Sequence, residues 1–291
     1  MTSLRQLEYL VTVVDTGSFT RAAEQLHVTQ PALSHQVRAL EQHVGGPLLE
    51  RLPRSVRLTP MGRAMLPHAR AALADAERAL CAARQASGLM AGELLVATVY
   101  SVSLGVLPAA LRVWRRDHPA VDVRLFEFRH ADELREAMTA GEADVAIGPE
   151  PAGWEGPVRS LGVEEFVVVL PPDGATEGDG GTVDLATLAD CAWVHYAPGH
   201  GLAEILDAAC ADAGFRPRPA VRTEQTATAP ILAAAGLGPA LVPANVLPPN
   251  FEGRVLRPSK PVRRVLTAYN RPGPDPLTSG FVEILARHAR V

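Results

Sequence analysis

The sequence contains few cysteines and a single lysine. Three of its 291 residues are cysteines, Cys81, Cys191 and Cys210, and they lie far apart in the chain. No Cys-x-x-Cys pair and no cluster of histidines accompanies them, so the spacing does not resemble a metal site, and we expect neither a metal nor a cofactor. Lys260 is the one lysine among 28 basic residues. We attribute this bias to the codons of a GC-rich genome rather than to a need for bidentate contacts.

A long uninterrupted hydrophobic run is also missing. Residues 227–249 are apolar enough to raise the question of a membrane span, but prolines and glycines interrupt them at Pro230, Gly236, Gly238, Pro239 and Pro243. This pattern fits a buried helix, turn and strand. The N-terminus carries Glu8 inside its short apolar stretch and no small-residue cleavage pattern, so we expect a cytoplasmic protein without a signal peptide.

The usual signs of catalysis are missing as well. We find no serine in a nucleophile elbow, no glycine-rich phosphate loop and no pair of carboxylates that the sequence brings together. The segment 141–148, GEADVAIG, contains single acidic residues that suit turns. An enzyme is therefore not expected.

Residues 18–44 predict two short helices joined by a tight turn. In the second helix, Thr29 is a suitable N-cap and Pro31 sits where a missing N–H costs little. An apolar stripe with helical spacing follows at Leu33, Val37, Leu40 and Val44. The opposite face and the exposed N-terminal end carry short polar or positive groups, which are our candidates for DNA contact: Gln30, Pro31, Ser34, His35 and Arg38.

The preceding segments predict two supporting helices. Ser18 is a plausible cap for the first helix of the pair, Ala22 and Ala23 allow a close helix crossing, and Leu26 and Val28 turn inward. An earlier helix is indicated by an apolar series at Leu4, Leu7, Leu10, Val11 and Val14. Taken alone, these helices also fit any small helical domain with a polar outer face.

The segment 47–60, PLLERLPRSVRLTP, favours the DNA-binding interpretation. It reads as two short strands around a turn, with Arg51, Arg54 and Arg57 close together and Glu50 as the nearby acid. This is the layout of a winged helix-turn-helix. The charge agrees, because residues 1–90 hold ten arginines against seven acidic residues, a net +3, whereas residues 91–291 have a net charge of −7.

Residues 61–87 predict one helix of about 27 residues, roughly 40 Å long. Its apolar residues recur three and four apart, as in a heptad seam, so we expect the helix to pair with a second copy of itself. An alanine-rich helix that lies on its own domain is the alternative. The expected seam consists of Leu66, Ala69, Leu73, Ala76, Leu80 and Ala83. Ser87, Gly88 and Gly92 then mark a hinge.

From Glu93 onward the sequence alternates between strand and helix patterns. The first set comprises strands at 94–99, 121–128 and 144–148, with helices at 104–116 and 131–140. The second comprises strands at 164–171, 193–197 and 240–243 and a helix at 202–213, before a strand at 263–270 and a helix at 277–290. The first set predicts a parallel α/β layout, and the two sets together predict two small α/β lobes joined by two crossings, with a cleft between them. A solute-binding transport protein shares this layout, but it should carry a signal peptide and no N-terminal DNA module.

Ligands of such open sheets bind beyond the C-terminal ends of the strands, where helix N-termini offer N–H donors. This rule selects the candidate effector-binding residues Thr98, Ser101, Ser103, Arg129, His130, Gly148, His200, Gln225 and Thr226. The hydroxyl residues also fit ordinary helix caps, and the histidines fit either a pH sensor or a polar edge. Arg129 can clamp a carboxylate, which suggests a carboxylate effector, or it can pair with Asp132 or Glu133.

The first 62 residues resemble the DNA-binding domain of LysR-type transcriptional regulators, and the later chain is similar to the family's effector-binding domain. The match runs without an evident gap through LRQLEYLVTVVDTGSFTRAAEQLHVTQPALSHQVRALEQHVGGPLLERLPRSVRLTPMG. One departure is His35, where the family often has arginine. A mostly neutral imidazole makes a weaker phosphate contact. The resemblance also sets Arg129 apart, because the family usually has a small residue near that position.

The resemblance implies an α/β protein with three parts. These are a winged helix-turn-helix at residues 1–60, a dimerisation helix at 61–87 and a two-lobed, periplasmic-binding-protein-like effector domain at 91–291. Lobe I is expected at about 91–162 plus 264–291, and lobe II at about 163–263. The implied function is sequence-specific regulation of transcription under the control of a small molecule.

The implied partners are double-stranded DNA, a small-molecule effector and a second copy of the chain, often in a tetramer. RNA polymerase is a further candidate, and no membrane is expected. Redox or constitutive control is the alternative. In the peroxide-sensing branch of the family, a reactive cysteine precedes its partner by nine residues. Here Cys210 stands in the partner's place but Gly201 occupies the other position, so we expect Cys210 to be a small buried hydrophobe.

Overall fold

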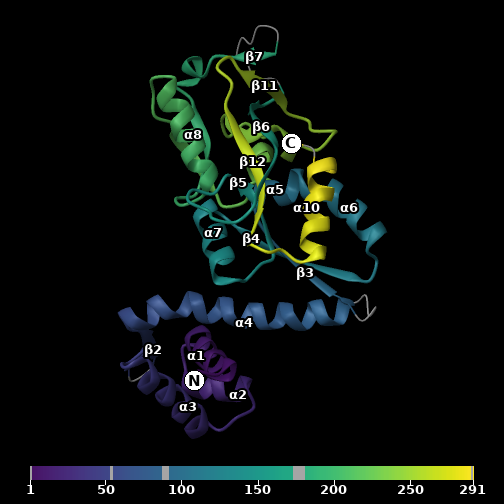
Figure 1. Ribbon diagram of the computed structural model, residues 1–291. Helices are drawn as coiled ribbons and strands as arrows, with labels where there is room; N and C mark the ends of the chain where they lie inside the picture. The colour runs from purple at the N-terminus through teal and green to yellow at the C-terminus, as the bar shows by residue number, and fades with distance from the viewer. Residues whose placement is uncertain (1, 53–54, 87–91, 173–180, 290) are drawn as a thin grey trace. The chain divides into compact units, whose positions relative to one another are not determined.

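The computed structural model describes residues 2–52, 55–86, 92–172, 181–289 and 291. It divides the chain into two compact units, one built on the residues up to Gly92 and one built on the residues from Glu93 onward, apart from the stretch 136–142 (Figure 1). Each unit has a hydrophobic core of its own. The described part of the chain contains no helix long and apolar enough to cross a membrane.

The N-terminal unit begins with three helices, α1 (Leu4–Thr16), α2 (Phe19–Gln25) and α3 (Gln30–Val44). The predicted caps are confirmed, since the hydroxyls of Ser18 and Thr29 accept hydrogen bonds from backbone N–H groups in the first turns of α2 and α3. α3 ends at Gly45, whose φ of 85° lies in the left-handed region that favours glycine. The turn from α2 to α3 is therefore encoded locally.

The core of this unit lies where the three helices meet. Leu33, Val37 and Leu40 of α3 are buried, as their spacing predicts. The predicted first helix is confirmed as α1, and Leu10 of its apolar series is buried, whereas Leu4 at its start is 49% exposed. Tyr9 and Val13 join Leu10 in the core, and Leu7 and Val14 pack against it, so the buried face of α1 is wider than the predicted series.

A two-stranded wing and a long helix complete the unit. Strands β1 (Leu49–Leu52) and β2 (Ser55–Leu58) pair antiparallel, which confirms the predicted hairpin. Helix α4 (Pro60–Ala86) follows and is 27 residues long. The Thr59 hydroxyl accepts from the N–H of Gly62 and donates to the carbonyl of Pro47, so the start of α4 is tied to the start of the wing segment.

The second unit is a mixed α/β structure. Its elements in chain order are β3 (Gly92–Val99), α5 (Tyr100–Gly105), α6 (Leu107–Asp117), β4 (Val121–Phe128), α7 (Ala131–Ala140), β5 (Val145–Pro149), β6 (Val158–Leu170), β7 (Thr182–Val183), η1 (Leu185–Leu188), β8 (Ala192–Tyr196), α8 (Gly201–Asp212), β9 (Arg218–Thr223), α9 (Thr228–Ala234), β10 (Ala240–Pro243), η2 (Ala244–Val246), β11 (Arg254–Pro258), β12 (Arg263–Asn270) and α10 (Pro276–His288).

The main sheet has the strand order β4-β3-β5-β12-β6-β11-β7, and β10 pairs with β6 beside this path. β3 and β5 run parallel, as do β8 and β9 in a separate pair, but β12 is antiparallel to β5 and β6, and β10 and β11 are antiparallel to β6. The parallel layout predicted for the first set is confirmed for β3 and β5, whereas the returning strand β12 pairs antiparallel with both β5 and β6. The chain enters and leaves the second half of the sheet through β6 and β12, which lie antiparallel to each other.

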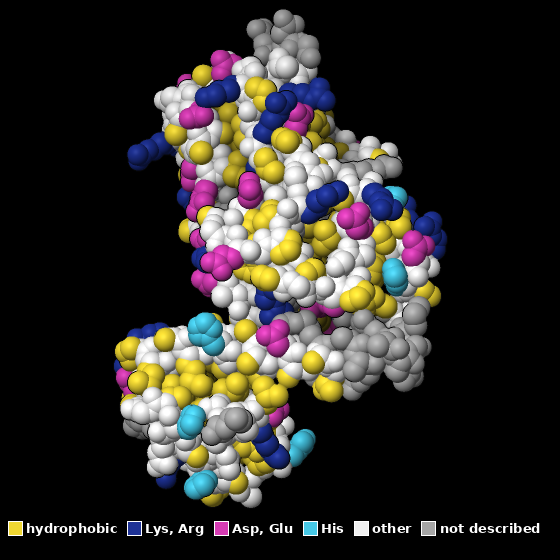
Figure 2. Space-filling model, viewed as in Figure 1, with side chains coloured by type: hydrophobic (Ala, Val, Ile, Leu, Met, Phe, Trp, Pro, Cys, Tyr) yellow, Lys and Arg dark blue, Asp and Glu magenta, His cyan; other side chains and the backbone are white. Residues whose placement is uncertain are grey.

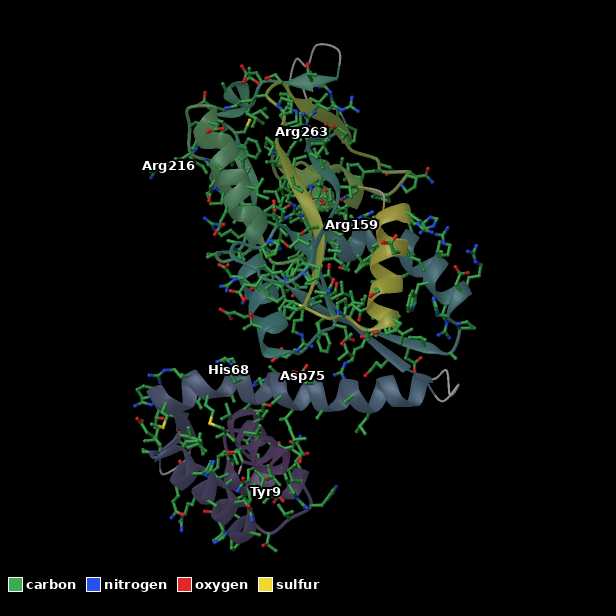
Figure 3. All side chains as sticks on the ribbon, in the orientation of Figure 1. Tyr9, His68, Asp75, Arg159, Arg216 and Arg263 are labelled. Carbon is green, nitrogen blue, oxygen red and sulfur yellow. The ribbon has the colours of Figure 1, made fainter. Side chains whose placement is uncertain are left out.

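The pair β6 and β12 connects the two lobes. Arg159 and Arg263, both labelled in Figure 3, mark two levels of this ribbon. Near Arg159, β12 pairs with β5 as well as with β6. Arg263 of β12 is the register partner of Glu165, and the residues of β6 that follow Glu165 pair with β10 and β11 instead. That second half, Phe166 to Leu170, is buried and forms part of a core with Trp193, Tyr196 and Leu206. Two lobes joined by two crossings are thus present, as predicted.

Several predicted elements have different bounds. The single helix expected at 104–116 is two helices, α5 and α6, because Pro108 lies at the start of α6, where its missing N–H and fixed φ suit a new helix rather than a continued one. Strand β6 begins at Val158, six residues before the predicted start. Elements β7, β9 and β11 were not predicted, whereas α9 and β10 are the helix and the strand that the sequence indicates within 227–249.

Candidate functional site

The outer face of α3 is an open row of polar side chains. Four of the five predicted DNA-contacting residues are exposed there: Gln30, Pro31, His35 and Arg38. The Arg38 guanidinium forms no ion pair with a described residue. The neighbouring Glu41 turns away, because its carboxylate accepts the N–H groups of Leu48 and Leu49 at 2.9 and 3.1 Å and so anchors the wing. Arg38 is therefore available to an external anion.

The prediction that Ser34 lies on this open face is wrong. Ser34 is only 6% exposed, although it is one residue from the exposed His35. Its small side chain lies at the edge of the Leu33–Val37 stripe, where packing of α3 against its neighbours covers it. At 100° per residue, Ser34 lies at the boundary between the buried and the exposed face of α3. The periodicity alone therefore could not predict whether Ser34 is buried.

The wing presents one described arginine outward. Arg57 is exposed and pairs with Glu50 across the hairpin, with Nη2 2.8 Å from Oε2. An exposed pair of this kind contributes little, so a stronger anion can compete for the guanidinium. Arg54 and the side chain of Arg51, which we also predicted to contact DNA, lie outside the described residues.

A shallow groove with apolar and charged lining residues lies between α1 and α4 within the N-terminal unit. It has a volume of about 470 Å³, and its lining residues are Leu4, Arg5, Glu8, Tyr9, Leu26, Leu73, Ala76 and Leu80. Hydrophobic side chains gather on this unit in Figure 2. Leu4 and Leu80 are 49% and 53% exposed, so part of the predicted seam is open to solvent.

Not every residue of the predicted seam is open. Ala69 is only 2% exposed within a single chain, so the prediction that it faces a second copy is wrong. Leu66 is half-buried, and the side chain of Ala83 lies outside the described residues.

A second candidate site is a small pocket of about 40 Å³ between the two lobes. Lobe I contributes the C-terminal ends of β3 and β5 and the segment after β4, and lobe II contributes the start of α8. This is the sheet edge that the sequence predicts. The lining residues are Val99, Tyr100, Ser101, Arg129, His130, Ala131, Pro149, His200, Gly201, Leu202 and Arg264.

A buried ion pair lies at this pocket. Arg264 of β12 is the register partner of Glu164 on β6, and its Nε lies 2.5 Å from Glu164 Oε2. Glu164 is 1% exposed, and its other oxygen accepts from Asn245 Nδ2 at 3.1 Å. Arg264 Nη2 also donates to the Ser101 hydroxyl at 2.6 Å. These hydrogen bonds hold the Arg264 and Glu164 side chains in fixed positions beside the pocket. Removal of either residue would leave the other as an uncompensated buried charge.

His200 is buried and neutral at the start of α8. Its Nδ1 accepts the N–H of Leu202 at 3.1 Å, so the imidazole caps the helix and its proton belongs on Nε2. Nε2 is buried and has no partner among the described residues. Burial, and then the charges of Arg129, Arg264 and His130, lowers the pKa of His200 to about 4. The side chain therefore offers an unsatisfied donor without a charge.

Arg129 and His130 link the two lobes. The carbonyl of Arg129 accepts the N–H of Gly201 at 2.9 Å, and His130 Nε2 lies 3.4 Å from the carboxylate of Glu204. The Arg129 guanidinium is half exposed and lies 3.6 Å from Glu133, one of the two surface partners that the sequence suggested. It also lines the pocket, so both roles foreseen for Arg129 are compatible with the structure.

The other predicted effector-binding residues do not line the pocket. Thr98 is fully buried, and its hydroxyl donates to the carbonyl of Ile147 inside the sheet. Gly148 lies in the core beside Leu134, and Ser103 donates to the Tyr100 carbonyl and to Glu127. Gln225 is exposed, and the Thr226 hydroxyl is buried without a described partner, but neither residue reaches the pocket. The location of a residue at the end of a strand therefore did not predict whether its side chain points into the pocket.

The sequence matches family models over both units. Residues 4–63 match the bacterial regulatory helix-turn-helix protein of the lysR family, and residues 87–290 match the LysR substrate binding domain. The HTH-type transcriptional regulator IlvR of Caulobacter vibrioides is 34% identical over 251 residues, 84% of this chain and 83% of IlvR. The chain belongs to the LysR family of transcriptional regulators.

Solved structures agree with this assignment. CbnR, a LysR family transcriptional regulator, superposes with a TM-score of 0.73 at 28% identity over 100% of both chains. Full-length CbnR in complex with its target DNA gives a TM-score of 0.71 at 28% identity over 98% of this chain and 99% of CbnR. The predicted winged helix-turn-helix and two-lobed effector domain are thereby confirmed, as is a function in DNA-binding transcriptional regulation under effector control.

The cysteines of this LysR-family chain give little support to redox control. Cys210 is fully buried on α8, as expected, and burial followed by the charge of Asp207 raises the pKa of its thiol to about 12. A thiol that stays protonated is a poor nucleophile toward an oxidant. Cys191 is half-buried, and the side chain of Cys81 lies outside the described residues.

Sequence reasoning missed Arg264, Glu164 and Tyr100 at the pocket. A signal for the pair did exist. Glu164 lies two residues before the buried stretch 166–170 of β6, and Arg264 lies two residues before the buried stretch 266–270 of β12. Charged residues that are covered beside such stretches require partners. The two lie 100 residues apart, and only the antiparallel pairing of β6 with β12 places them opposite each other.

Proposed function

We propose that this LysR-family regulator contacts DNA through the open face of α3 and through the wing. The support is the exposed row Gln30, Pro31, His35 and Arg38, in which Arg38 has no described ion-pair partner. Short polar groups at the N-terminal end of a recognition helix reach base edges, and arginines fix the helix on phosphates. Arg57, Arg51 and Arg54 of the wing take a phosphate-contacting role in this proposal. Ser34 supports the helix from inside.

We further propose that two copies pair through α4 and α1. The second copy is the occupant that fits the groove between these helices, because the apolar residues that line it on α4, the half-buried Leu73 and Ala76 and the exposed Leu80, follow a three-and-four spacing. Two recognition helices in one particle can then bind two half-sites. The division into a DNA-binding domain at 1–60, a pairing helix at 61–87 and an effector domain at 91–291 belongs to this proposal, as do a tetramer, a location in the cytoplasm and a contact with RNA polymerase.

The effector that the interlobe pocket favours is a small organic carboxylate. One observation carries this proposal: Arg129, Arg264 and the unsatisfied Nε2–H of neutral His200 all line the same small pocket. Two guanidinium groups attract an anion, and His200 adds a neutral hydrogen bond that orients it. Because the buried Glu164 already balances Arg264, the half-exposed guanidinium of Arg129, which has only the surface contact with Glu133, is the group that a single ligand carboxylate binds in this proposal.

Control of DNA binding follows from the position of the pocket between the lobes. A ligand that contacts Arg129 of lobe I and His200 of lobe II stabilises one relative orientation of the lobes, and it shifts the equilibrium by its difference in affinity for the two orientations. The ribbon of β6 and β12 is the element that must bend, because it is the double crossing between the lobes.

A thermal-shift experiment on the full-length chain tests the effector proposal. Small monocarboxylates and their matched amides are compared on the wild-type chain, on Arg129→Ala and on Arg159→Ala, which removes an exposed arginine away from the pocket. We expect carboxylates, but not amides, to raise the melting temperature of wild type and of Arg159→Ala, and to do so much less in Arg129→Ala. Equal rises in all three proteins, or no rise with any acid, would reject a carboxylate at Arg129 and leave the DNA-binding proposal untouched.

A further inference from the structure

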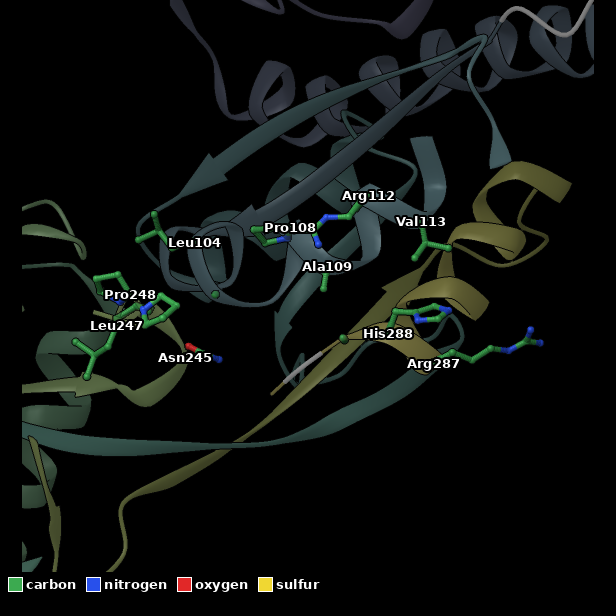
Figure 4. Close-up of a pocket in the computed structure, with 14 residues that line it drawn as sticks. Leu104, Pro108, Ala109, Arg112, Val113, Asn245, Leu247, Pro248, Arg287 and His288 are labelled. Atoms are coloured by element: carbon green, nitrogen blue, oxygen red, sulfur yellow. The ribbon is translucent and has the colours of Figure 1, made fainter. Parts of the chain in front are cut away.

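A large groove on the effector domain is separate from the interlobe pocket. It has a volume of about 900 Å³ and lies between α6, the C-terminal end of α10 and the segment that follows β10 (Figure 4). Its lining residues are Leu104, Gly105, Pro108, Ala109, Arg112, Val113, Asn245, Val246, Leu247, Pro248, Pro249, Arg287, His288 and Ala289. None of them lines the interlobe pocket. The volume lies within the usual range for organic ligands, about 300–1,000 Å³.

The walls of the groove are apolar and its charges have one sign. Leu104, Pro108 and Val113 form one side with α5 and α6, and Leu247 and Pro248 form another (Figure 4). Leu104 is 45% exposed, an unusual degree of exposure for a leucine beside a concave surface. The ionisable lining residues are Arg112, Arg287 and His288, and no acidic residue joins them.

Arg112 is the cation best placed to receive a ligand. Arg287 extends away from the other lining residues in Figure 4 and lies 3.5 Å from Glu283 on its own helix. Arg112 forms no ion pair or hydrogen bond with another residue of the described chain, and the adjacent Arg116 already pairs with Asp117. An unpaired guanidinium beside an apolar wall matches the carboxylate or sulfonate of an amphipathic anion.

The far wall of the groove is held in a fixed position. Asn245 Nδ2 donates to the buried carboxylate of Glu164, and Asn245 packs against Gly105, where a β-carbon would lie 2.6 Å from Asn245 Oδ1. The segment after β10 therefore approaches α5 closely only because residue 105 is glycine. The groove is preformed, which lowers the entropic cost of binding.

We propose that this groove is a second ligand site, for an organic anion with an apolar body, whose charged group binds Arg112. It goes beyond the interlobe effector pocket, and it needs neither Arg129 nor His200. The apolar body contacts Leu104, Val113 and Leu247, and His288 lies on the opposite side of the groove from α6 (Figure 4).

The probe for this site is 8-anilinonaphthalene-1-sulfonate, an aromatic anion whose fluorescence rises in apolar surroundings. It is titrated into the full-length chain and into Arg112→Ala, with Arg115→Ala as the matched control, because Arg115 is an exposed arginine of α6 that does not line the groove. We expect Arg112→Ala to raise the dissociation constant about threefold to fivefold, the range for an exposed ion pair, and Arg115→Ala to leave it unchanged.

A second pair of variants isolates charge from shape. Leu104→Glu places a carboxylate in the groove, whereas Leu104→Gln makes a neutral change of nearly the same size, and both alter an exposed position that folding tolerates. We expect the glutamate variant to bind the probe several-fold more weakly than the glutamine variant. Equal binding by both, together with unchanged binding by Arg112→Ala, would overturn the proposal.

Two further results would also overturn it. Weaker probe binding in Arg129→Ala would place the anion in the interlobe pocket instead. A change in sedimentation mass in Leu104→Glu but not in Leu104→Gln would identify the groove as an interface between copies of the chain.

Discussion

At the scale of single residues, His200 couples the interlobe pocket to pH. Burial lowers its folded-state pKa to about 4, below the ordinary histidine pKa of 6.5, so folding excludes a proton that the unfolded chain binds. Above pH 6.5, the pKa of the imidazole in the unfolded chain, His200 therefore has no effect on the free energy of unfolding. That free energy falls as the pH drops from about 6.5 towards 4. At pH 4.5 the loss amounts to about 2 kcal/mol in the free energy of unfolding.

The variant His200→Gln should remove this loss, because glutamine does not titrate. We expect the difference in unfolding free energy between pH 7 and pH 4.5, measured by urea denaturation of the full-length chain, to be about 2 kcal/mol smaller in His200→Gln than in wild type. His68→Gln, which replaces an exposed histidine, is the control and should behave like wild type. The same pH dependence in His200→Gln and wild type would contradict a buried neutral imidazole.

At the scale of secondary-structure elements, local signals predicted well and distant pairing did not. Ser18 and Thr29 fix the starts of α2 and α3 through contacts within three residues, and the wing turns on itself within ten residues, so the N-terminal unit could be read from the sequence. Arg264 and Glu164 meet only because β6 and β12 pair across 100 residues. No local pattern carries that information, and for this reason the strand-end rule found Ser101, Arg129, His130 and His200 but missed the ion pair beside them.

Helix α4 shows the same limit in another form. Its three-and-four spacing predicted a continuous seam, but the seam is divided in the structure, since Ala69 is buried within the single chain while Leu80 is open. Periodicity locates the apolar face of a helix without saying whether the same chain or another one covers it.

Pairing through the open part of α4 can be tested at Leu80. We expect Leu80→Glu to raise the dissociation constant of the dimer by about tenfold or more, because burial of one leucine contributes about 1.5–3 kcal/mol and a buried carboxylate adds a further penalty. Sedimentation velocity over a range of concentrations measures this effect. His68→Glu introduces the same charge on an exposed residue of α4 outside the groove and should leave the dimer intact. A dimer that survives Leu80→Glu unchanged would place the pairing surface elsewhere.

At the scale of the whole molecule, the uneven charge separates DNA binding from effector binding. The first 90 residues carry a net charge of +3, although the whole chain has −4, so the attraction to DNA must come from a few local arginines rather than from the overall field. Each phosphate contact contributes about 0.9 to the slope of log affinity against log salt concentration, and a particle with two copies of α3 uses each contact twice.

The variant Arg38→Ala should therefore flatten this slope by about two units if both copies engage DNA, and by about one if a single copy does. The measurement is fluorescence anisotropy with a labelled duplex over a series of salt concentrations. Arg115→Ala is the control, because it removes the same charge from the effector domain. A change in DNA affinity that comes from net charge alone should be equal in the two variants. An equal slope in Arg38→Ala and Arg115→Ala would show that Arg38 does not contact a phosphate. A weaker affinity at unchanged slope would instead assign Arg38 to a base edge, because a base contact releases no counterion.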